Sequence, residues 1–350
     1  MSQPETSAVE AMEEEVDRIS ILPDDILVHI LSPLPTKQAF VTSVLSKRWK
    51  NLWCLVPALE FVGTKTVTVS KYVVSRQAAG NHYMHNWERI YPEFPNTIFT
   101  RETLVILKLS ELFMGSGFCN YLIRLPSLKT LHLKDIEFQQ YGDLDCLLEG
   151  CPVLEDLQLY DISYVSLLFS NACRKTLTKL NRADIIQCDC GVRMKALSNV
   201  EFLHIKLSKG YLHYVFPAFN NLTHLVLNYS HSIDLQMLHD CPKLQTLELY
   251  QKNRGSIRGD GSYGKQDWSV PKSVPSCLLL NLTTCTLRDI GFPDFRQHIL
   301  LARYILNNSA VLETMSVGCC WNLSKIKGKL FSSSRVSATC KLSVYLEQYY

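Results

Sequence analysis

The chain has 350 residues, of which 47% are hydrophobic and 20% are charged, and its formal net charge is +3. This balance is typical of a folded protein with one large domain or two to three smaller ones. No segment approaches the roughly 20 consecutive apolar residues that cross a bilayer. Lysine and arginine form no stripe that alternates with aromatic residues, so we expect neither a membrane nor a nucleic acid as a partner.

The first fifteen residues are polar and acidic, without a positively charged start or an apolar run. They do not resemble a secretory signal. We therefore expect residues 1–16 to be a disordered acidic tail of an intracellular protein, in the nucleus, the cytoplasm or both. The thirteen cysteines are then expected to be reduced thiols. The closest clusters, Cys188 with Cys190 and Cys319 with Cys320, lack the Cys-x-x-Cys spacing of a structural zinc site, so we expect no metal and no cofactor.

Residues 17–61 predict a module of three short helices. Leu22-Pro23 opens the first helix, because proline fits the first helical position, where its missing N–H needs no partner. Apolar residues follow at helical spacing. The second helix is predicted at residues 36–41 and the third at residues 43–53. So small a module has a thin core, and we expect it to gain order by docking on a partner.

Several spaced motifs of this module match a known family. They are Leu22-Pro23-Asp24, Ile30-Leu31, Leu34-Pro35, Val44-Leu45-Ser46-Lys47-Arg48-Trp49 and Leu52-Trp53. The module closely resembles the F-box of plant F-box proteins. That resemblance implies docking on a Skp-type adaptor, which bridges to a cullin and a RING subunit. It also implies that the docking surface and the core behind it are made by Leu22, Pro23, Ile26, Ile30, Leu31, Leu34, Val44, Leu45, Trp49 and Trp53.

One position departs from the family pattern. Position 33 is proline, where related F-boxes commonly carry a bulky apolar or aromatic residue. Proline removes a hydrogen bond at the end of the first helix and an apolar contact. We expect it to weaken docking without abolishing it.

Residues 97–250 contain a recurring Leu-x-x-Leu-x-Leu pattern. Its copies follow one another every 22 to 26 residues, a period typical of leucine-rich repeats, and they are Leu104-Leu107-Leu109, Leu128-Leu131-Leu133, Leu154-Leu157-Leu159, the degraded Leu177-Leu180, Val200-Leu203-Ile205, Leu222-Leu225-Leu227 and Leu244-Leu247-Leu249. The last two apolar positions of each copy point to one face of a short strand. Stacked copies would bury that face together in a solenoid. Residues 181–192 are compressed, so stacking there is expected to be interrupted.

Two near-identical phrases give the cysteines of the repeats a structural interpretation. GCPVLEDLQL contains Cys151 and DCPKLQTLEL contains Cys241. In both, the cysteine precedes the strand and is predicted to pack in the bend.

The residues between the strand leucines are predicted to line the concave side of the array. They mix charged, imidazole and phenol groups, which suits a polypeptide surface. We predict that a protein target binds there through Lys108, His132, Lys134, Asp156, Gln158, Tyr160, His204, Lys206, His224, Glu248 and Tyr250.

The remaining segments complete the domain organisation. Residues 62–96 are predicted to be an irregular linker and residues 251–272 a glycine-rich loop. Residues 273–350 give strand, helix and strand signals, with the helix at residues 303–307. The motifs Val274-Pro275-Ser276-Cys277-Leu278, Tyr304-Ile305-Leu306 and Val311-Leu312-Glu313-Thr314-Met315 make this segment similar to the FBD segment of plant F-box proteins, and we expect it to cap the array.

No catalytic motif is found, neither a phosphate loop nor a nucleophile elbow. The sequence thus predicts a mixed α/β protein: a three-helix F-box, a leucine-rich repeat solenoid and an FBD-like cap. The resemblance implies a non-catalytic substrate receptor of an SCF-type ubiquitin ligase. Two alternatives stay open: an adaptor-binding interaction protein or decoy that forms no active ligase, and an enzyme that uses the histidines and cysteines.

Overall fold

The computed structural model describes residues 18–19, 21–63, 96–115, 122–140, 142–166, 177–188, 194–207, 217–229, 235–250, 271, 273–290, 295–319 and 323–347. The chain divides into two compact units, Met1–Ala58 and Leu59–Tyr350, which are treated separately below. The expected acidic tail and most of the linker and glycine-rich loop lie outside the described residues.

The first unit is helical. Its elements are α1 (Asp24–Leu31), α2 (Thr36–Val41) and two 3₁₀ segments, η1 (Thr42–Val44) and η2 (Trp49–Leu55). Pro23 and Pro35 stand directly before the two α-helices with extended backbones, as expected for residues that precede a first turn. The small core is formed by Leu27, Leu31, Ala39, Trp49 and Leu52.

The third helix, predicted at residues 43–53, is not continuous. The chain forms two 3₁₀ segments with an irregular break between Val44 and Trp49. Residues 45 and 49 would share one face of an α-helix, yet Leu45 is 64% exposed while Trp49 is only 7% exposed. The break turns these two apolar side chains in different directions, and this is the physical reason for the difference.

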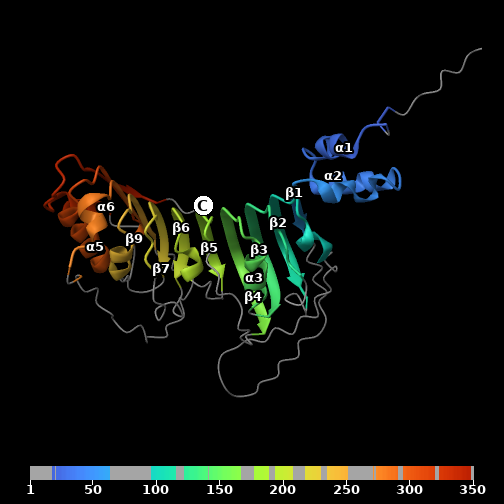
Figure 1. Cartoon of the computed structure of the whole chain (residues 1–350). Helices are drawn as coiled ribbons and strands as arrows, with labels where there is room; N and C mark the ends of the chain where they lie inside the picture. The colour runs from blue at the N-terminus through green and yellow to red at the C-terminus, as the bar shows by residue number, and fades with distance from the viewer. Residues whose placement is uncertain are drawn as a thin grey trace, which may run out of the picture. The chain divides into compact units, whose positions relative to one another are not determined.

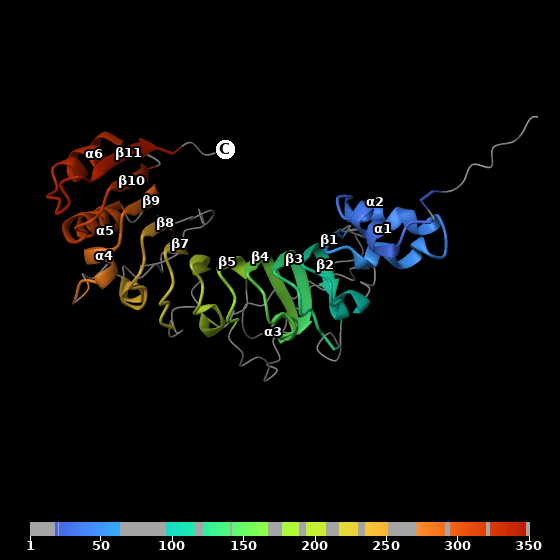
Figure 2. The same cartoon turned by 45° about the horizontal axis from the view of Figure 1, so that its top comes forward.

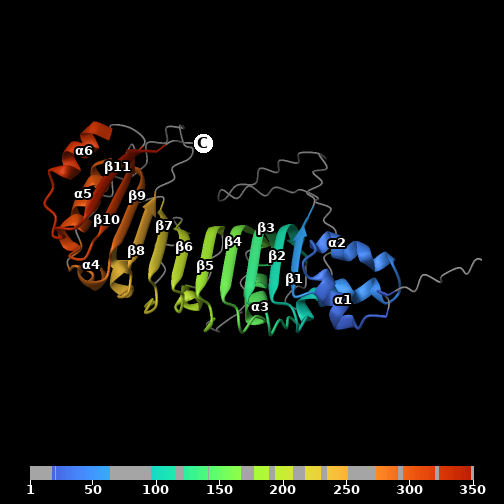
Figure 3. The same ribbon diagram turned by 90° about the horizontal axis from the view of Figure 1, so that it is seen from above.

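The second unit is built on a sheet of eleven strands in sequence order (Figure 3). The strands are β1 (Ala58–Val62), β2 (Ile106–Met114), β3 (Thr130–Gln140), β4 (Asp156–Ser166), β5 (Arg182–Cys188), β6 (Phe202–Leu207), β7 (His224–Tyr229), β8 (Thr246–Tyr250), β9 (Thr284–Ile290), β10 (Thr314–Cys319) and β11 (Lys341–Leu346). Every pairing from β2 to β11 is parallel. β1 contains residues 59–61, which the sequence had placed at the end of the F-box.

The repeat leucines form the core of this unit. Side chains in each strand alternate between buried and half-buried, as in β8, where Leu247 and Leu249 are buried. The repeats are joined by a backbone ladder in which two successive N–H groups donate to one carbonyl of the preceding repeat. The N–H groups of Glu155 and Asp156, for example, both donate to the Lys129 carbonyl.

Stacking continues across residues 181–188, so the interruption expected there was wrong, and residues 189–192 lie outside the described residues. The N–H groups of Asn181 and Arg182 donate to the Glu155 carbonyl, and the Asn181 carbonyl accepts from the next repeat. β5 is in register with β4 and β6. Ala183 and Ile185 occupy the buried positions of the pattern, and two small or β-branched residues fill them as well as leucine does.

A stacked bulge lengthens the first strands of the array. Glu111, Asp135 and Asp161 have φ values of 56°, 55° and 54°, and they lie at the same level in β2, β3 and β4. Each is an extra residue in its strand, and the alternation of buried and half-buried side chains resumes after it with a buried residue. Gly63 lies against this column: its N–H donates to the Ser110 carbonyl, and a Cβ there would stand 2.1 Å from the Glu111 carbonyl oxygen.

Short helical segments connect the strands. They are η3 (Asn96–Thr100), α3 (Asp143–Glu149), η5 (Met194–Leu197) and η7 (Leu235–Asp240) in the repeats, and α4 (Ser276–Leu280), α5 (Phe295–Asn308) and α6 (Leu323–Phe331) near the C-terminus (Figure 2). No helix in the described part of the chain is long and apolar enough to span a membrane.

The C-terminal segment does not form a separate cap. β9, β10 and β11 extend the same parallel sheet beyond β8 (Figure 1). The predicted helix at residues 303–307 is the second half of α5, and α6 was not predicted. The segment continues the array because Cys285, Leu287, Met315 and Val317 provide the same buried alternation as the leucines do.

Candidate functional site

The helical unit carries an exposed apolar surface, and the structure divides the predicted docking residues between that surface and the core. Leu31 and Trp49 are buried, and Leu22 and Trp53 are half-buried. The exposed members are Pro23, Ile26, Ile30, Leu34, Val44 and Leu45. Val44 is 80% exposed, which is unusual for an apolar side chain in so small a unit and is typical of a binding surface.

Further apolar side chains are exposed beside these. Phe40 and Val41 of α2 are about half exposed, and each precedes an exposed residue, Val44 or Leu45, by four positions. The Phe40 ring also meets Trp53 edge to face, with centroids 5.3 Å apart. The sequence analysis missed Phe40 and Val41, although their four-residue spacing from Val44 and Leu45 was a signal for them. We call Ile26, Ile30, Leu34, Phe40, Val41, Val44 and Leu45 the apolar surface.

Arg48 links the start of α1 to the segment just before η2. Its guanidinium donates to the Asp24 carboxylate, with Nε 2.8 Å from Oδ1, and to the Leu22 carbonyl. Asp24 is in the first turn of α1, where a carboxylate is favoured by the helix dipole. This cross-link holds the start of α1 against the break before η2.

Pro33 is accommodated without loss to α1. The helix ends at Leu31, and the Ser32 N–H and hydroxyl both donate to the Val28 carbonyl, at 2.9 and 2.7 Å. Pro33 therefore follows the last helical hydrogen bond and is exposed. Its effect on docking stays a prediction.

The predicted target-binding residues all lie on one face of the sheet, which we call the open face. They alternate with the buried leucines of β2, β3, β4, β6, β7 and β8. Lys134 and His224 are exposed, and the other nine are half-buried. The strand register places Lys108, His132, Gln158, His204 and Glu248 in one row across the sheet, together with Asp184 of β5.

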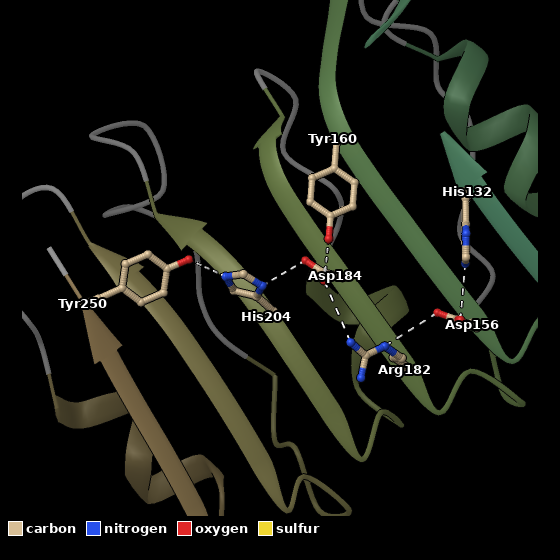
Figure 4. A network of polar contacts seen from close by, with 7 residues as sticks. All are labelled: His132, Asp156, Tyr160, Arg182, Asp184, His204 and Tyr250. Atoms are coloured by element: carbon tan, nitrogen blue, oxygen red, sulfur yellow. Dashed lines mark hydrogen bonds and ion pairs between the residues drawn. The ribbon is translucent and has the colours of Figure 1, made fainter. Parts of the chain in front are cut away.

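Asp184 is the centre of a polar network on this face (Figure 4). The Tyr160 hydroxyl donates to Asp184 Oδ2 at 2.6 Å, and His204 Nδ1 lies 3.0 Å from Oδ1. The other ring nitrogen of His204 is 2.6 Å from the Tyr250 hydroxyl. Tyr250 reaches His204 across β7, where the intervening residue is the short Val226.

A second arm of the network centres on Arg182. Its guanidinium lies 4.0 Å from Asp156 and 3.9 Å from Asp184, and stacks 3.8 Å from the centroid of the Phe202 ring. Asp156 also lies 3.3 Å from His132 Nε2. The network thus runs continuously from β3 to β8 and holds its side chains in fixed positions.

The network shifts the pKa of its members. Burial by itself raises the pKa of Asp184, but hydrogen bonds from His204 and Tyr160, with the charges of His204 and Arg182, outweigh it and hold that pKa below its ordinary value. Burial and the hydrogen bond to Asp184 raise the pKa of Tyr160. Burial also raises the pKa of Tyr250. At neutral pH the carboxylate is therefore charged and both phenols are neutral.

The sequence analysis missed Arg182, Asp184 and Phe202. The first two are in the degraded repeat, and the signal was weak because no leucine marks β5. Once β5 is aligned with its neighbours, Asp184 falls at the level of Gln158 and His204, which were predicted.

The cysteines of the repeats are structural. The Cys151 thiol donates to the Leu147 carbonyl and the Cys241 thiol to the Met237 carbonyl, each four residues earlier, and both side chains are fully buried. Burial raises the pKa of Cys151 to about 12. The expectation of reduced thiols does not hold for Cys146, which is disulfide-bonded. No cluster of metal-binding side chains is found among the described residues.

Comparison with known families matches three parts of the chain. The F-box domain model matches residues 19–60, the model for the LRR repeats of FBD-associated F-box protein At5g56370 matches residues 81–190, and the FBD model matches residues 270–317. The fold and these matches define a protein with F-box, leucine-rich repeat and FBD regions in that order.

Its homologues are F-box/FBD/LRR-repeat proteins of Arabidopsis thaliana. FBD-associated F-box protein At4g10400 is 27% identical and covers 94% of this chain and all of its own length. F-box/FBD/LRR-repeat protein At4g26340 is 28% identical and covers 85% of this chain and 92% of its own. The first alignment spans 423 positions, more than the 350 residues of this chain, so that relative has residues without a counterpart here. No solved structure matches the chain.

Proposed function

We propose that this protein is the non-catalytic substrate receptor of an SCF-type ubiquitin ligase. In this proposal the F-box binds a Skp-type adaptor, the open face binds a protein target, and the complex acts in the nucleus, the cytoplasm or both. The single observation that carries the first half is the apolar surface of the helical unit, which coincides with the F-box match. Ubiquitin transfer would be done by the partners, and this chain would supply proximity and orientation.

The chemistry of the two surfaces suits these two roles. The apolar surface would bury its side chains against an adaptor, at roughly 1.5–3 kcal/mol for each large side chain. The open face has Tyr160, Arg182 and Tyr250 held in place by the polar network. Tyrosine and arginine are among the residue types that most often dominate the binding energy of an interface. Side chains that are fixed before binding lose less conformational entropy when the partner binds.

The adaptor half is tested by co-purification of the full chain with a plant Skp-type adaptor. The double variant Val44→Asp/Leu45→Asp should bind about 100-fold more weakly, because two apolar contacts are replaced by buried charges. Val165→Asp provides the control, since Val165 of β4 is also an exposed apolar residue but lies in the other unit. Equal adaptor binding by both variants would refute this docking surface.

Co-purification of the cullin distinguishes a ligase receptor from a decoy. A receptor should bring the cullin and the RING subunit down together with the adaptor, whereas a decoy should bring down the adaptor alone. Recovery of the adaptor without a cullin would therefore replace the ligase proposal by the decoy.

A further inference from the structure

β11 is the last strand of the sheet, and its outer edge has no partner among the described strands. The N–H groups of Lys341 and Glu347, at its two ends, donate to carbonyls beside β10. Because successive residues of a strand direct their backbone groups to opposite sides, the N–H and C=O groups of Leu342, Val344 and Leu346 point outward. An exposed edge of this kind is a template for another strand.

The chain around this edge is strongly basic. Residues 314–346 contain five lysines and arginines and no aspartate or glutamate. Glu347 follows directly, but its side chain lies over Gly318 of β10, on the sheet side of β11.

α6 carries three of these cations. The helix packs against β11 and α5 (Figure 3), with Ile326 and Leu330 buried. Lys325 and Lys329 are on one flank and Lys327 is on the other, and all three are exposed. Between the flanks is Gly328, where a Cβ would meet no atom within 4 Å. Internal packing therefore does not require glycine at this position.

We propose that the free edge of β11, with the lysines of α6 beside it, binds an extended acidic peptide segment of a partner protein. The peptide would add a strand to the sheet through backbone hydrogen bonds, and its carboxylates would pair with the lysines. A nucleic acid or a lipid surface could interact with the lysines but could not add a strand to the edge, so the partner is a polypeptide. The proposal is independent of the ligase role.

The test uses the full chain and a short fluorescein-labelled peptide of alternating threonine and glutamate, with binding followed by fluorescence polarisation. Binding should weaken as salt is added. The combined variant Lys325→Glu/Lys327→Glu/Lys329→Glu should bind about tenfold more weakly or worse. Reversal of Lys179, Lys195 and Lys243, which are exposed and lie outside the strands, makes the same charge change elsewhere and should leave binding unchanged.

Peptide controls keep the result independent of how the variants fold. The same peptide N-methylated at alternate residues retains its charges but loses the N–H groups of one edge, and should not bind. A threonine and lysine peptide should not bind either. Equal binding by the N-methylated peptide, equal loss from the reversal of Lys179, Lys195 and Lys243, or binding of poly(U) RNA or phosphatidylserine vesicles without binding of the peptide would each overturn the proposal.

Discussion

Replacement of Asp184 by asparagine should destabilise the repeat unit by roughly 2–3 kcal/mol at neutral pH. The buried carboxylate accepts from Tyr160 at 2.6 Å and faces His204 Nδ1 at 3.0 Å. Hydrogen bonds to a charged group contribute roughly 1.5–3 kcal/mol each. Asparagine keeps one acceptor oxygen and relieves the cost of burying a charge, so the net loss is less than the sum of two such bonds.

The assay is urea unfolding of the full chain followed by circular dichroism. Asp161→Asn is the matched control, because Asp161 is exposed at a positive φ that asparagine also tolerates. It should change stability by less than about 0.5 kcal/mol.

The pH dependence of this difference has a definite sign. Because the pKa of Asp184 is lowered on folding, the stability that its charge contributes is present above its ordinary pKa of 3.8 and is lost as pH falls through the lowered value. The gap between wild type and variant should therefore shrink in acid. A gap of the same size at pH 7 and at low pH, or an equal effect of Asp161→Asn, would refute the assignment of a charged, hydrogen-bonded Asp184.

Three further changes test the structure elsewhere. Gly63→Ala should destabilise the start of the sheet, since its Cβ would clash with the Glu111 carbonyl. Gly328→Ala should instead stabilise α6 by about 0.5–1 kcal/mol. Thermal unfolding measures both, and a change of stability in the same direction for the two variants would contradict these backbone positions. Arg48→Ala should destabilise the F-box unit by about 1 kcal/mol through loss of its hydrogen bonds to Asp24 and Leu22, visible in hydrogen exchange of α1. Cys151, whose pKa burial raises to about 12, should resist alkylation at pH 8 in the folded chain and react after unfolding; rapid modification of the native protein would show the thiol to be accessible.

The repeat sequence predicted the sheet well where leucines mark both positions of a strand. β2, β3, β4, β6, β7 and β8 all coincide with a predicted copy. Stacking at β5 was doubted because residues 181–192 are compressed, yet Ala183 and Ile185 fill its buried positions, since burial accepts any apolar residue of suitable size. The stacked bulge was not predicted, because a positive φ at an acidic residue produces no periodic pattern in the sequence.

The two candidate surfaces were predictable to different degrees. Family motifs identified the F-box residues, but they could not separate Trp49 in the core from Val44 on the surface, since both are apolar and only the broken helix turns them apart. The open face was predictable from the alternation of side chains. Its polar network was not, because Asp184 and Arg182 come from the strand without a leucine signature.

The pairing between β5 and β6 has a mechanical consequence. It runs only from Arg182 to Ile185 on β5, whereas β4 pairs with β5 from Asp156 to Ile162 and β6 pairs with β7 along its whole length. In a repeat array each strand is held only by its neighbours, so this joint depends strongly on the side chains that cross it. The Asp184–His204 contact crosses the joint, and the Arg182 guanidinium stacks on Phe202 across it. A target bound over these residues would hold the two halves of the array together, and its release would loosen them.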